Sequence, residues 1–468
     1  MKSHAAISKT FLKDEPRVDW HNKAVYNFRE KRDLTVKSIP EWEELRELAS
    51  SIKENVLANL DDYLIQFEEK AIANGVNVHW ASNAKEHNEI VYSILKRHKV
   101  EHLVKSKSML TEECRLNEYL EAKEIEVIDT DLGERIIQLR NEPPSHLIAP
   151  AIHLKREEVG VLFEDKLKTE KGNSDPTYLT GEARKHLREK FLNAQAGLTG
   201  VNFAIADTGG VVVVTNEGNA DLGCNIPPIQ IHSVGIEKII PRWEDLGVFT
   251  RMLAASATGQ RISIYTSHYI KPKDDDEMHI VLVDNGRSEH LGREDFRSSL
   301  KCIRCAACMN TCPVYRRSGG YSYHSTIVGP IGAILEPGKD LKAKSDLPFA
   351  SSLCGSCSDV CPVKIDIDKQ LYKWRQIAVR EGHVSYLKTK GMAMAGNILS
   401  DSKLYNKWAG IAKYLLRKLP RWMIYNPLNA WGTSRELTVP PEQTFTEWYK
   451  SQNHDSKNEL ENGQAGNS

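Results

Sequence analysis

Apolar residues recur every three to four positions along the first part of the chain, the period of a helix buried on one face. The stretch EWEELRELASSIKENVLANLDDYLIQFEEKAIANG, residues 41–75, keeps this pattern until Gly75 ends it. The positions between the apolar residues are mostly charged or polar. We therefore predict an N-terminal helical segment over residues 1–60, with its pattern continuing into the next region.

Short apolar runs alternate with longer helical patterns over residues 61–298. The run EIEVID is followed by GERIIQLRN, IEKIIP is followed by WEDLGVFTRMLAASATG, and HIVLVDNG ends the series. Short runs that are apolar throughout are typical of strands buried on both faces of a sheet. Strands and helices in turn predict an α/β domain whose sheet is covered on its faces.

The remainder of the chain divides into three further parts. Residues 299–385 hold most of the cysteines and are punctuated by Gly and Pro. Residues 386–450 return to a helical pattern. Residues 451–468 are polar, with the composition of a disordered tail. We expect a cysteine-rich α-helical domain, a helical C-terminal region and a tail.

The composition narrows the classes of function. The 468 residues suffice for two or three domains, and 63 Lys and Arg balance 63 Asp and Glu, so no net charge favours nucleic acid as a partner. No apolar run approaches the roughly 20 residues that span a membrane, and the first residues lack the apolar core of a secretion signal. We expect a cytoplasmic protein whose membrane contact is at most peripheral.

The cysteines are concentrated in one short region. Seven of the nine lie between residues 302 and 361, whereas Cys114 and Cys224 stand alone. In a reducing compartment such clustering favours metal thiolates over disulfides. The two isolated cysteines have the pattern of plain buried thiols.

The first cysteine block has the spacing of a ferredoxin. Cys302, Cys305 and Cys308 are three residues apart, and Cys312 follows four later with a proline after it. In two-cluster ferredoxins the first three thiolates bind one iron-sulfur cluster and the fourth binds the other. By this symmetry, Cys361 of the second block completes the first cluster. The sequence therefore predicts a [4Fe-4S] cluster on Cys302, Cys305, Cys308 and Cys361.

The second cluster is left with one ligand too few. Cys312, Cys354 and Cys357 remain for it, and the position that matches the leading cysteine of the first block is Ser351. The fourth iron is then either absent, which gives [3Fe-4S], or bound by water, a serine, a histidine such as His324, or a substrate or partner group. We expect two clusters, both [4Fe-4S] unless the second is [3Fe-4S].

Zinc is the main alternative metal for a cysteine-rich segment. Tetrahedral zinc sites take four ligands in two pairs that lie farther apart than the thiols of a C-x2-C-x2-C-x3-C-P run. The spacing therefore favours iron-sulfur clusters.

The cysteine blocks and the segments before them resemble the lactate utilization protein B family. The resemblance rests on KCIRCAACMNTCPVYRRSGGYSYHSTIVGPIGAIL and SSLCGSCSDVCPVKIDI, and upstream on VKSKSMLTEE, LRNEPPSHLIAPAIH and GVNFAIADTGGVVVVTNEGN. It extends over residues 20–450, nearly the whole chain. The first cysteine block is common to many redox proteins, and its combination with the upstream segments makes the resemblance specific.

The resemblance implies a fold, a pathway and partners. Residues 61–298 would form a lactate-utilization (LUD) domain, an α/β sandwich similar to the isomerase and coenzyme A transferase group, followed by an α-helical two-cluster ferredoxin-like domain. The family's system oxidises L-lactate to pyruvate for growth on lactate. Its other components are an iron-sulfur, cysteine-rich subunit and a second LUD-domain subunit. The family also implies that a second block with three cysteines is normal.

Two segments of the α/β domain could bind an anion. The turn residues at the two ends of ADTGGVVVVTNEGN expose backbone amides that can bind a carboxylate or phosphate. A tight hairpin explains the same residues equally well. These turn residues are Asp207, Thr208, Gly209, Gly210, Glu217, Gly218 and Asn219. Lys105 and Lys107 lie on the same side of a strand end, where they could meet a carboxylate or simply be solvated.

Two further segments carry a possible role. Glu142 and His146, beside a Pro-Pro turn, are candidates for general acid and base catalysis. Residues 403–422 combine apolar residues at helical spacing with lysines and arginines, and Pro420 shortens the helix. This pattern favours partner docking or internal packing over membrane binding.

These features favour an iron-sulfur electron-transfer component of a complex that oxidises L-lactate, and so a subunit of an oxidoreductase. No G-x-G-x-x-G follows a strand, so a nicotinamide or flavin fingerprint is absent. Because hydride removal needs a two-electron carrier, part of the chemistry falls to another subunit or an unidentified cofactor. The alternatives are a stand-alone enzyme that binds an acyl or coenzyme A substrate, and a redox-sensing regulator. The sequence assigns no catalytic residue and no electron acceptor.

Overall fold

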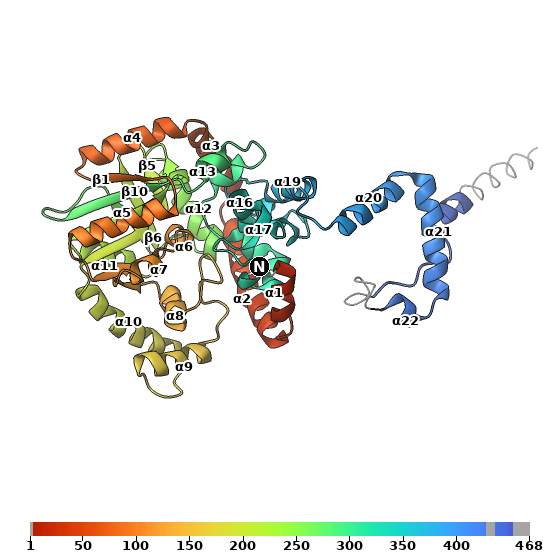
Figure 1. The fold of residues 1–468 in the computed structure, drawn as a ribbon, viewed down its shortest axis with the longest axis horizontal. Coiled ribbons are helices and arrows are strands. Elements are labelled where there is room, and N and C mark those ends of the chain that lie inside the picture. The colour runs from red at the N-terminus through yellow and green to blue at the C-terminus, as the bar shows by residue number, and fades with distance from the viewer. Residues whose placement is uncertain (1–2, 427–435, 453–468) are drawn as a thin grey trace, which may run out of the picture. The chain divides into compact units, whose positions relative to one another are not determined.

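A six-stranded parallel sheet forms the centre of the α/β domain in the computed structural model, which describes residues 3–426 and 436–452 (Figure 1). In spatial order its strands are β1 (Asn77–Ala81), β10 (Glu277–Val283), β7 (Ile229–Gly235), β4 (Ala196–Gly200), β2 (His102–Lys105) and β3 (Glu126–Asp129). Strand β10 is buried on both faces, because Ile280 and Leu282 join one core and Val281 and Val283 join another. This continuous apolar run is the signal that predicted a covered sheet.

A second, four-stranded sheet covers one face of the first. Its order is β8 (Ile239–Ile240), β5 (Phe203–Ile205), β6 (Gly210–Thr215) and β9 (Tyr265–Tyr269), with antiparallel pairing of β5 with β6 and of β6 with β9. Val211 and Val213 of β6 share a core with Ile280 and Leu282. The apolar run IEKIIP predicted β8, whereas β9 was not predicted, and no pattern showed that these strands leave the parallel sheet, because apolar runs do not specify a strand's partners.

Helices cover the other face and the ends of the large sheet. Helices α5 (Ala84–Arg97), α6 (Met109–Glu113) and α7 (Leu116–Glu121) share a core with strands β2, β7 and β10. The remaining helices of this domain are α8 (Leu132–Arg140), α9 (Arg156–Leu167), α10 (Pro176–Leu192), α11 (Asn219–Asn225), α12 (Leu246–Thr258) and α13 (Arg287–Leu291), with a 3-10 turn η1 (Ile236–Lys238) before β8.

The N-terminal segment is helical and packs on the cysteine-rich region. Its helices are α1 (His4–Phe11), α2 (Glu15–Lys37), α3 (Trp42–Ala58) and α4 (Leu60–Ala73). Helix α2 begins where Asp14 accepts the amide of Arg17, with a proline in its first turn. Further along, Arg32 donates to the carbonyl of Val360 at 3.1 Å. Residues more than 300 positions apart are thereby joined around the cysteines.

Short helices and turns form the cysteine-rich region itself. They are η2 (Arg297–Lys301), α14 (Ala307–Thr311), α15 (Pro313–Ser318), η3 (Gly320–Tyr323), α16 (Gly329–Lys339), α17 (Leu341–Lys344), η4 (Leu347–Phe349), α18 (Ser356–Asp359) and α19 (Ile367–Arg380). Trp374 anchors α19, because its ring stacks on Phe296 at 4.1 Å and its indole donates to the carbonyl of Ile334 at 2.9 Å. Residues 1–383 form one compact unit.

Residues 384–468 form a second unit, which contains α20 (Tyr386–Ser400), α21 (Ser402–Lys418) and α22 (Arg421–Ile424). Helix α21 ends two residues before Pro420, as its sequence predicts. Arg417 pairs with Glu442 at 3.0 Å and Lys413 pairs with Glu447 at 3.1 Å, so the chain after α22 returns to α21. The expected tail of residues 451–468 lies almost wholly outside the described residues. In the part of the chain that is described, no helix is both long and apolar enough to cross a membrane.

Candidate cluster sites and an adjoining pocket

Four of the seven clustered cysteines converge on one cavity. Cys302, Cys305, Cys308 and Cys361 all line a space of about 360 Å³, its mouth included. The rest of the wall is largely apolar and contains Leu147, Ile303, Ala306, Ile331, Pro362, Val363, Ile365 and Ile367. We name this arrangement cluster site 1. It joins three thiols of the first block with one thiol of the second.

Left-handed backbone positions shape the loop of site 1. Arg304 and Ala306 have φ of 61° and 62°, which few residues other than glycine adopt. These turns direct amides at sulfur, since the N–H of Arg304 lies 3.4 Å from the Sγ of Cys302. On the other side of the cavity, the N–H of Ile365 lies 3.4 Å from the Sγ of Cys361. Amides aimed at sulfur are the usual surroundings of an iron-sulfur cluster and help to set its potential.

The other three cysteines form cluster site 2, defined by Cys312, Cys354 and Cys357. Burial, together with the neighbouring Cys312 and Cys354, raises the pKa of Cys357 to about 12. A hydrogen bond of 2.5 Å between the hydroxyls of Thr311 and Ser356 ties the two cysteine loops together. Cys354 is exposed, whereas the four cysteines of site 1 are buried or half-buried.

The two sites adjoin and fit clusters with thiolate ligands. Burial raises the pKa of Cys308, and the thiols around it, Cys357 of site 2 included, raise it further. Burial likewise raises the pKa of Cys361 to about 11. Thiols that keep their protons at neutral pH when bare must release them to bind iron, so cluster binding and folding are coupled here. Arg46 donates to the carbonyl of Cys361 at 3.0 Å and places a positive charge beside this site.

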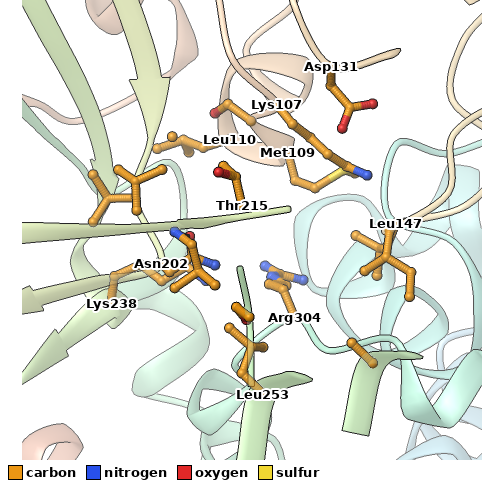
Figure 2. A pocket seen from close by; sticks show the side chains of 18 of the residues that line it. Lys107, Met109, Leu110, Asp131, Leu147, Asn202, Thr215, Lys238, Leu253 and Arg304 are labelled. Atoms are coloured by element: carbon orange, nitrogen blue, oxygen red, sulfur yellow. Dashed lines mark hydrogen bonds between the residues drawn. The ribbon is translucent and has the colours of Figure 1, made fainter. Parts of the chain in front are cut away.

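A larger pocket lies against site 1. It encloses about 1380 Å³ of empty space, its mouth included, and Leu147 and Arg304 line both this pocket and the cavity of site 1. We name it the central pocket. Figure 2 shows the side chains of Lys107, Lys238 and Arg304 directed toward its middle from different sides. The central pocket and site 1 therefore adjoin at Leu147 and Arg304.

A buried ion network forms the floor of the central pocket. Arg287 donates through Nε to Glu237 at 2.5 Å and through Nη2 to Glu113 at 3.2 Å. Although burial acts to raise it, the charge of Arg287 lowers the pKa of Glu237 to about 2. Arg304 lies 3.8 Å from both carboxylates. Glu237 is thus neutralised mainly by Arg287. Glu113 is neutralised by Arg287 together with Lys339, whose Nζ lies 3.2 Å away, so Arg304 keeps donors for other partners.

The structure separates the two lysines that the sequence grouped. Lys105 is fully buried, with its Nζ 2.8 Å from Asp129 and 3.0 Å from Glu112. Although burial acts to lower it, Asp129 raises the pKa of Lys105 well above its ordinary value, so this lysine is a structural cation. Lys107 instead lines the central pocket. Neither interpretation from the sequence, a ligand shared with Lys107 or a solvated lysine, holds for Lys105, because its side chain is buried against Asp129 of the neighbouring strand β3.

The glycine-rich segment also divides into two parts. The turn of Asp207 to Gly210 is a tight hairpin against α4, where a side-chain carbon at Gly209 would meet the amide of Ala71 at 2.3 Å. Glu217 and Asn219, at the far end of β6, line the central pocket. Burial, together with the charge of Asp131, raises the pKa of Glu217 to about 7. A carboxyl group near its titration point at neutral pH is unusual outside functional sites.

The pair Glu142 and His146 does not form an acid-base site. Glu142 pairs with Arg140 at 2.8 Å and with His153 at 3.1 Å. His146 is buried against Asn310 at 3.0 Å, and burial lowers its pKa to about 3, so it stays neutral. Its role is to join the α/β domain to helix α14.

Three other candidates have ordinary surroundings. His324 lies 3.3 Å from Asp346 and contacts Lys344, which accounts for both of its ring nitrogens. Cys114 and Cys224 are buried, and burial raises the pKa of each to about 12, as expected of inert thiols. Among the described residues, no group of three or more His, Cys, Asp and Glu side chains is arranged to hold a single metal ion.

Sequence reasoning did not single out Lys238, Arg287 and Arg304. Lys238 had a signal, because a lysine inside the apolar run IEKII requires an explanation. Arg304 stands between two cysteines of the first block, where its direction depends on the left-handed turn. Arg287 follows β10 and carries no local pattern.

Comparison with known proteins agrees with this architecture. Residues 64–288 match the family described as "LUD domain", and residues 298–365 match the "4Fe-4S dicluster domain". "Lactate utilization protein B" of Bacillus cytotoxicus is 43% identical over 422 residues, which cover 87% of this chain and 88% of that protein. The chain belongs to the lactate utilization protein B family.

Other relatives of the same name support the assignment over nearly the whole length. The protein from Macrococcus caseolyticus is 41% identical and covers 95% of this chain and 96% of its own length. That from Oceanobacillus iheyensis is 40% identical, with 94% and 93% covered. A crystal structure of a DUF162 family protein from Deinococcus radiodurans covers 48% of this chain and 98% of its own at 13% identity, with a TM-score of 0.28 that is too low to add to the assignment.

The family assignment confirms two expectations from the sequence. This member of the lactate utilization protein B family has a LUD domain followed by a domain for two [4Fe-4S] clusters, as predicted. The identity of each cluster's ligands is not decided by the comparison and stays a prediction.

Proposed function

We propose that this protein carries electrons through two clusters during the oxidation of L-lactate to pyruvate, as one component of a larger system. Cys302, Cys305, Cys308 and Cys361 would bind the first cluster, and Cys312, Cys354 and Cys357 would bind the second. The observation that carries the proposal is the convergence of thiols from both blocks on site 1, directly beside the central pocket. The names of the relatives supply the connection to lactate.

The chain's own residues define a direction for the electrons. When bound, a [4Fe-4S] cluster accepts and releases one electron at a time. Apolar side chains around site 1 exclude water, and Leu147 and Arg304 separate it from the central pocket. Cys354 of site 2 is exposed. A path from the central pocket through site 1 to site 2 therefore ends at the surface, where an acceptor can dock.

The partners proposed for this path are the other lactate-utilization components, a cysteine-rich iron-sulfur subunit and a second LUD-domain subunit. The relatives' names imply a shared lactate-utilization system without specifying these contacts. A protein acceptor would need to approach the surface around Cys354, because electron transfer requires the two redox centres to lie close together.

Lactate-driven reduction of the clusters tests this function. The anaerobically isolated full-length protein is mixed with an extract of its source cells that lacks only this chain, and L-lactate is added. We expect the visible absorbance of the clusters to bleach with lactate and extract together, and not with extract alone. Bleaching by dithionite but never by lactate would contradict the proposal. Turnover of lactate by the isolated chain with an artificial acceptor would instead favour a stand-alone enzyme.

A further inference from the structure

We propose that the central pocket binds a small 2-hydroxy or 2-oxo carboxylate, whose carboxylate group is held by Lys107, Lys238 and Arg304. The inference rests on the proposed function and assigns the substrate site to this chain. It places the bound acid on the opposite side of Arg304 and Leu147 from cluster site 1.

The cations of the pocket have unused capacity to bind an anion. Neither Lys107 nor Lys238 forms a salt bridge within the described part of the chain, although both line the pocket. The Nη1 of Arg304 is buried and has no hydrogen-bond partner among the described residues. A buried donor without a partner costs free energy, so a ligand that accepts its hydrogen bond is favoured. Figure 2 shows the Arg304 guanidinium directed into the pocket.

The charge balance favours a single carboxylate over a phosphate. Lys107, Lys238, Arg287 and Arg304 line the pocket together with Glu113, Asp131, Glu217 and Glu237, four groups of each sign. Burial raises the pKa of Glu217, which reduces the negative charge of the wall, and burial also lowers the pKa of Lys238. The charges of the wall are therefore close to balanced, and they leave room for one added negative charge rather than two. A dianion would leave an uncompensated charge beside two anionic clusters, which is unfavourable.

The other walls suit the rest of such a molecule. Asn202, Thr215 and Asn219 offer hydrogen-bonding groups for a hydroxyl or carbonyl oxygen. Met109 and Leu253 provide apolar surface for an alkyl group. A few polar groups on a largely apolar wall are typical of small-molecule sites.

Arg304 couples the pocket to site 1. Its backbone N–H lies 3.4 Å from the Sγ of Cys302, while its side chain lines the central pocket. A ligand that binds the guanidinium therefore acts on a residue whose amide contacts a cluster ligand. Binding should change the electronic surroundings of the cluster at site 1.

Calorimetry and electron paramagnetic resonance (EPR) together test the pocket. The anaerobically isolated protein, with both clusters, is titrated with sodium L-lactate, sodium pyruvate and sodium phosphate, and the reduced clusters are examined at each end point. We expect heat of binding and a changed EPR signal of the site 1 cluster with both carboxylates. Lys107→Met and Lys238→Met should each weaken carboxylate binding roughly 10- to 100-fold, the usual loss for one charged hydrogen bond. Lys85→Met, at a lysine with an 82% exposed side chain on α5, should change nothing.

The outcomes separate the pocket from the proposed electron transfer. The pocket proposal is wrong if neither carboxylate binds to protein that carries both clusters, if phosphate binds as tightly, or if both lysine variants bind normally. Each of these results leaves cluster reduction by lactate and extract untouched. Failure of that reduction, in protein that binds the carboxylates as expected, would contradict the proposed function alone.

A second inference concerns the missing cysteine, and it rests on a separate observation. The two cysteine loops have the same backbone geometry. Leu353 and Gly355 have φ of 55° and 79°, in register with the two left-handed residues of the first loop, Arg304 and Ala306. The N–H of Leu353 lies 3.0 Å from the Oγ of Ser351, just as the N–H of Arg304 lies 3.4 Å from the Sγ of Cys302.

The geometry points to Ser351 as the fourth ligand of the cluster at site 2. The helix that follows each loop also begins two residues after the cysteine at matching positions, α14 at Ala307 after Cys305 and α18 at Ser356 after Cys354. Ser351 thus keeps the place and the amide contact of a cluster ligand and changes only sulfur to oxygen. His324, the other side chain considered from the sequence, is bound to Asp346 instead.

Iron analysis and EPR of Ser351 variants test this ligand. In Ser351→Ala, mild oxidation with ferricyanide should release one iron atom as Fe²⁺ and give the EPR signal of an oxidised [3Fe-4S] cluster. Ser351→Cys should keep all of its iron under the same treatment, and its reduced site 2 signal should differ from that of the wild type. Ser352→Ala, at the exposed neighbour, is the matched control. Unchanged signals and iron content in both Ser351 variants would overturn the assignment.

Discussion

Replacing Cys361 with alanine is expected to remove about four of about eight iron atoms and to abolish the cluster at site 1, not the one at site 2. Cys361 lies in the second block, but its side chain lines the cavity of Cys302, Cys305 and Cys308. The loss of one thiolate from a buried, largely apolar site cannot be compensated by water. Iron analysis and EPR of the anaerobically isolated variant measure the effect.

The reciprocal variant makes this prediction specific to crossed ligation. Cys312→Ala lies in the first block and should remove the site 2 cluster while leaving site 1 intact. Cys114→Ala is the matched control, because this buried thiol lies outside both sites and should leave the iron content unchanged. If Cys361→Ala spared the cluster of the first three cysteines and Cys312→Ala destroyed it, each block would hold its own cluster and the crossed arrangement would be wrong.

Lys105→Met is expected to lower the free energy of unfolding by about 3–5 kcal/mol, the typical cost of leaving a buried charge without its partner. Lys105 is fully buried, and its removal leaves the carboxylate of Asp129, a residue that is 5% exposed, without its ion-pair partner. Glu112 loses an ion pair with the same lysine. Urea unfolding followed by far-ultraviolet circular dichroism, under anaerobic conditions, gives the change.

Lys107 provides the comparison on the same segment. Because Lys107 lines the central pocket and has no salt bridge with a described residue, Lys107→Met should change stability by no more than about 0.5 kcal/mol. The two lysines thus separate a structural effect from a binding effect. If both variants lost the same amount of stability, or if Lys105→Met lost none, the assignment of Lys105 as a structural cation would be wrong.

The sequence predicted most of the cluster region because its information is local. The spacing of the cysteines and the proline after each block indicated two clusters, and the register of the blocks identified Ser351. What the sequence could not provide was the contribution of α2 and α3, whose arginines reach the carbonyls of Val360 and Cys361 from more than 300 residues away. Such contacts leave no periodic signal.

The role of Lys105 shows where a local pattern is insufficient. Strand alternation placed Lys105 and Lys107 on one side, where either a shared ligand or solvation of both lysines was expected. The parallel pairing of β2 with β3 sets Lys105 directly opposite Asp129. Since the pairing of two strands depends on the whole sheet, no segment of sequence could reveal that the lysine already had a buried partner.

The central pocket illustrates the same limit for function. Its cations come from the loop after β2, the 3-10 turn before β8 and the first cysteine loop, which are distant in sequence. Only Lys107 and the Glu217 segment had been singled out beforehand. The fold of two stacked sheets beside the cysteine-rich region brings these segments together, and no sequence motif predicts that they lie close to one another.

The most direct test of the account is low-temperature EPR of the fully reduced, anaerobically isolated protein, combined with its iron content. Two neighbouring reduced clusters should give a spectrum split by their magnetic interaction, with about eight iron atoms per chain. A simple spectrum of one isolated cluster with about four iron atoms, or a colourless protein that contains zinc, would contradict it.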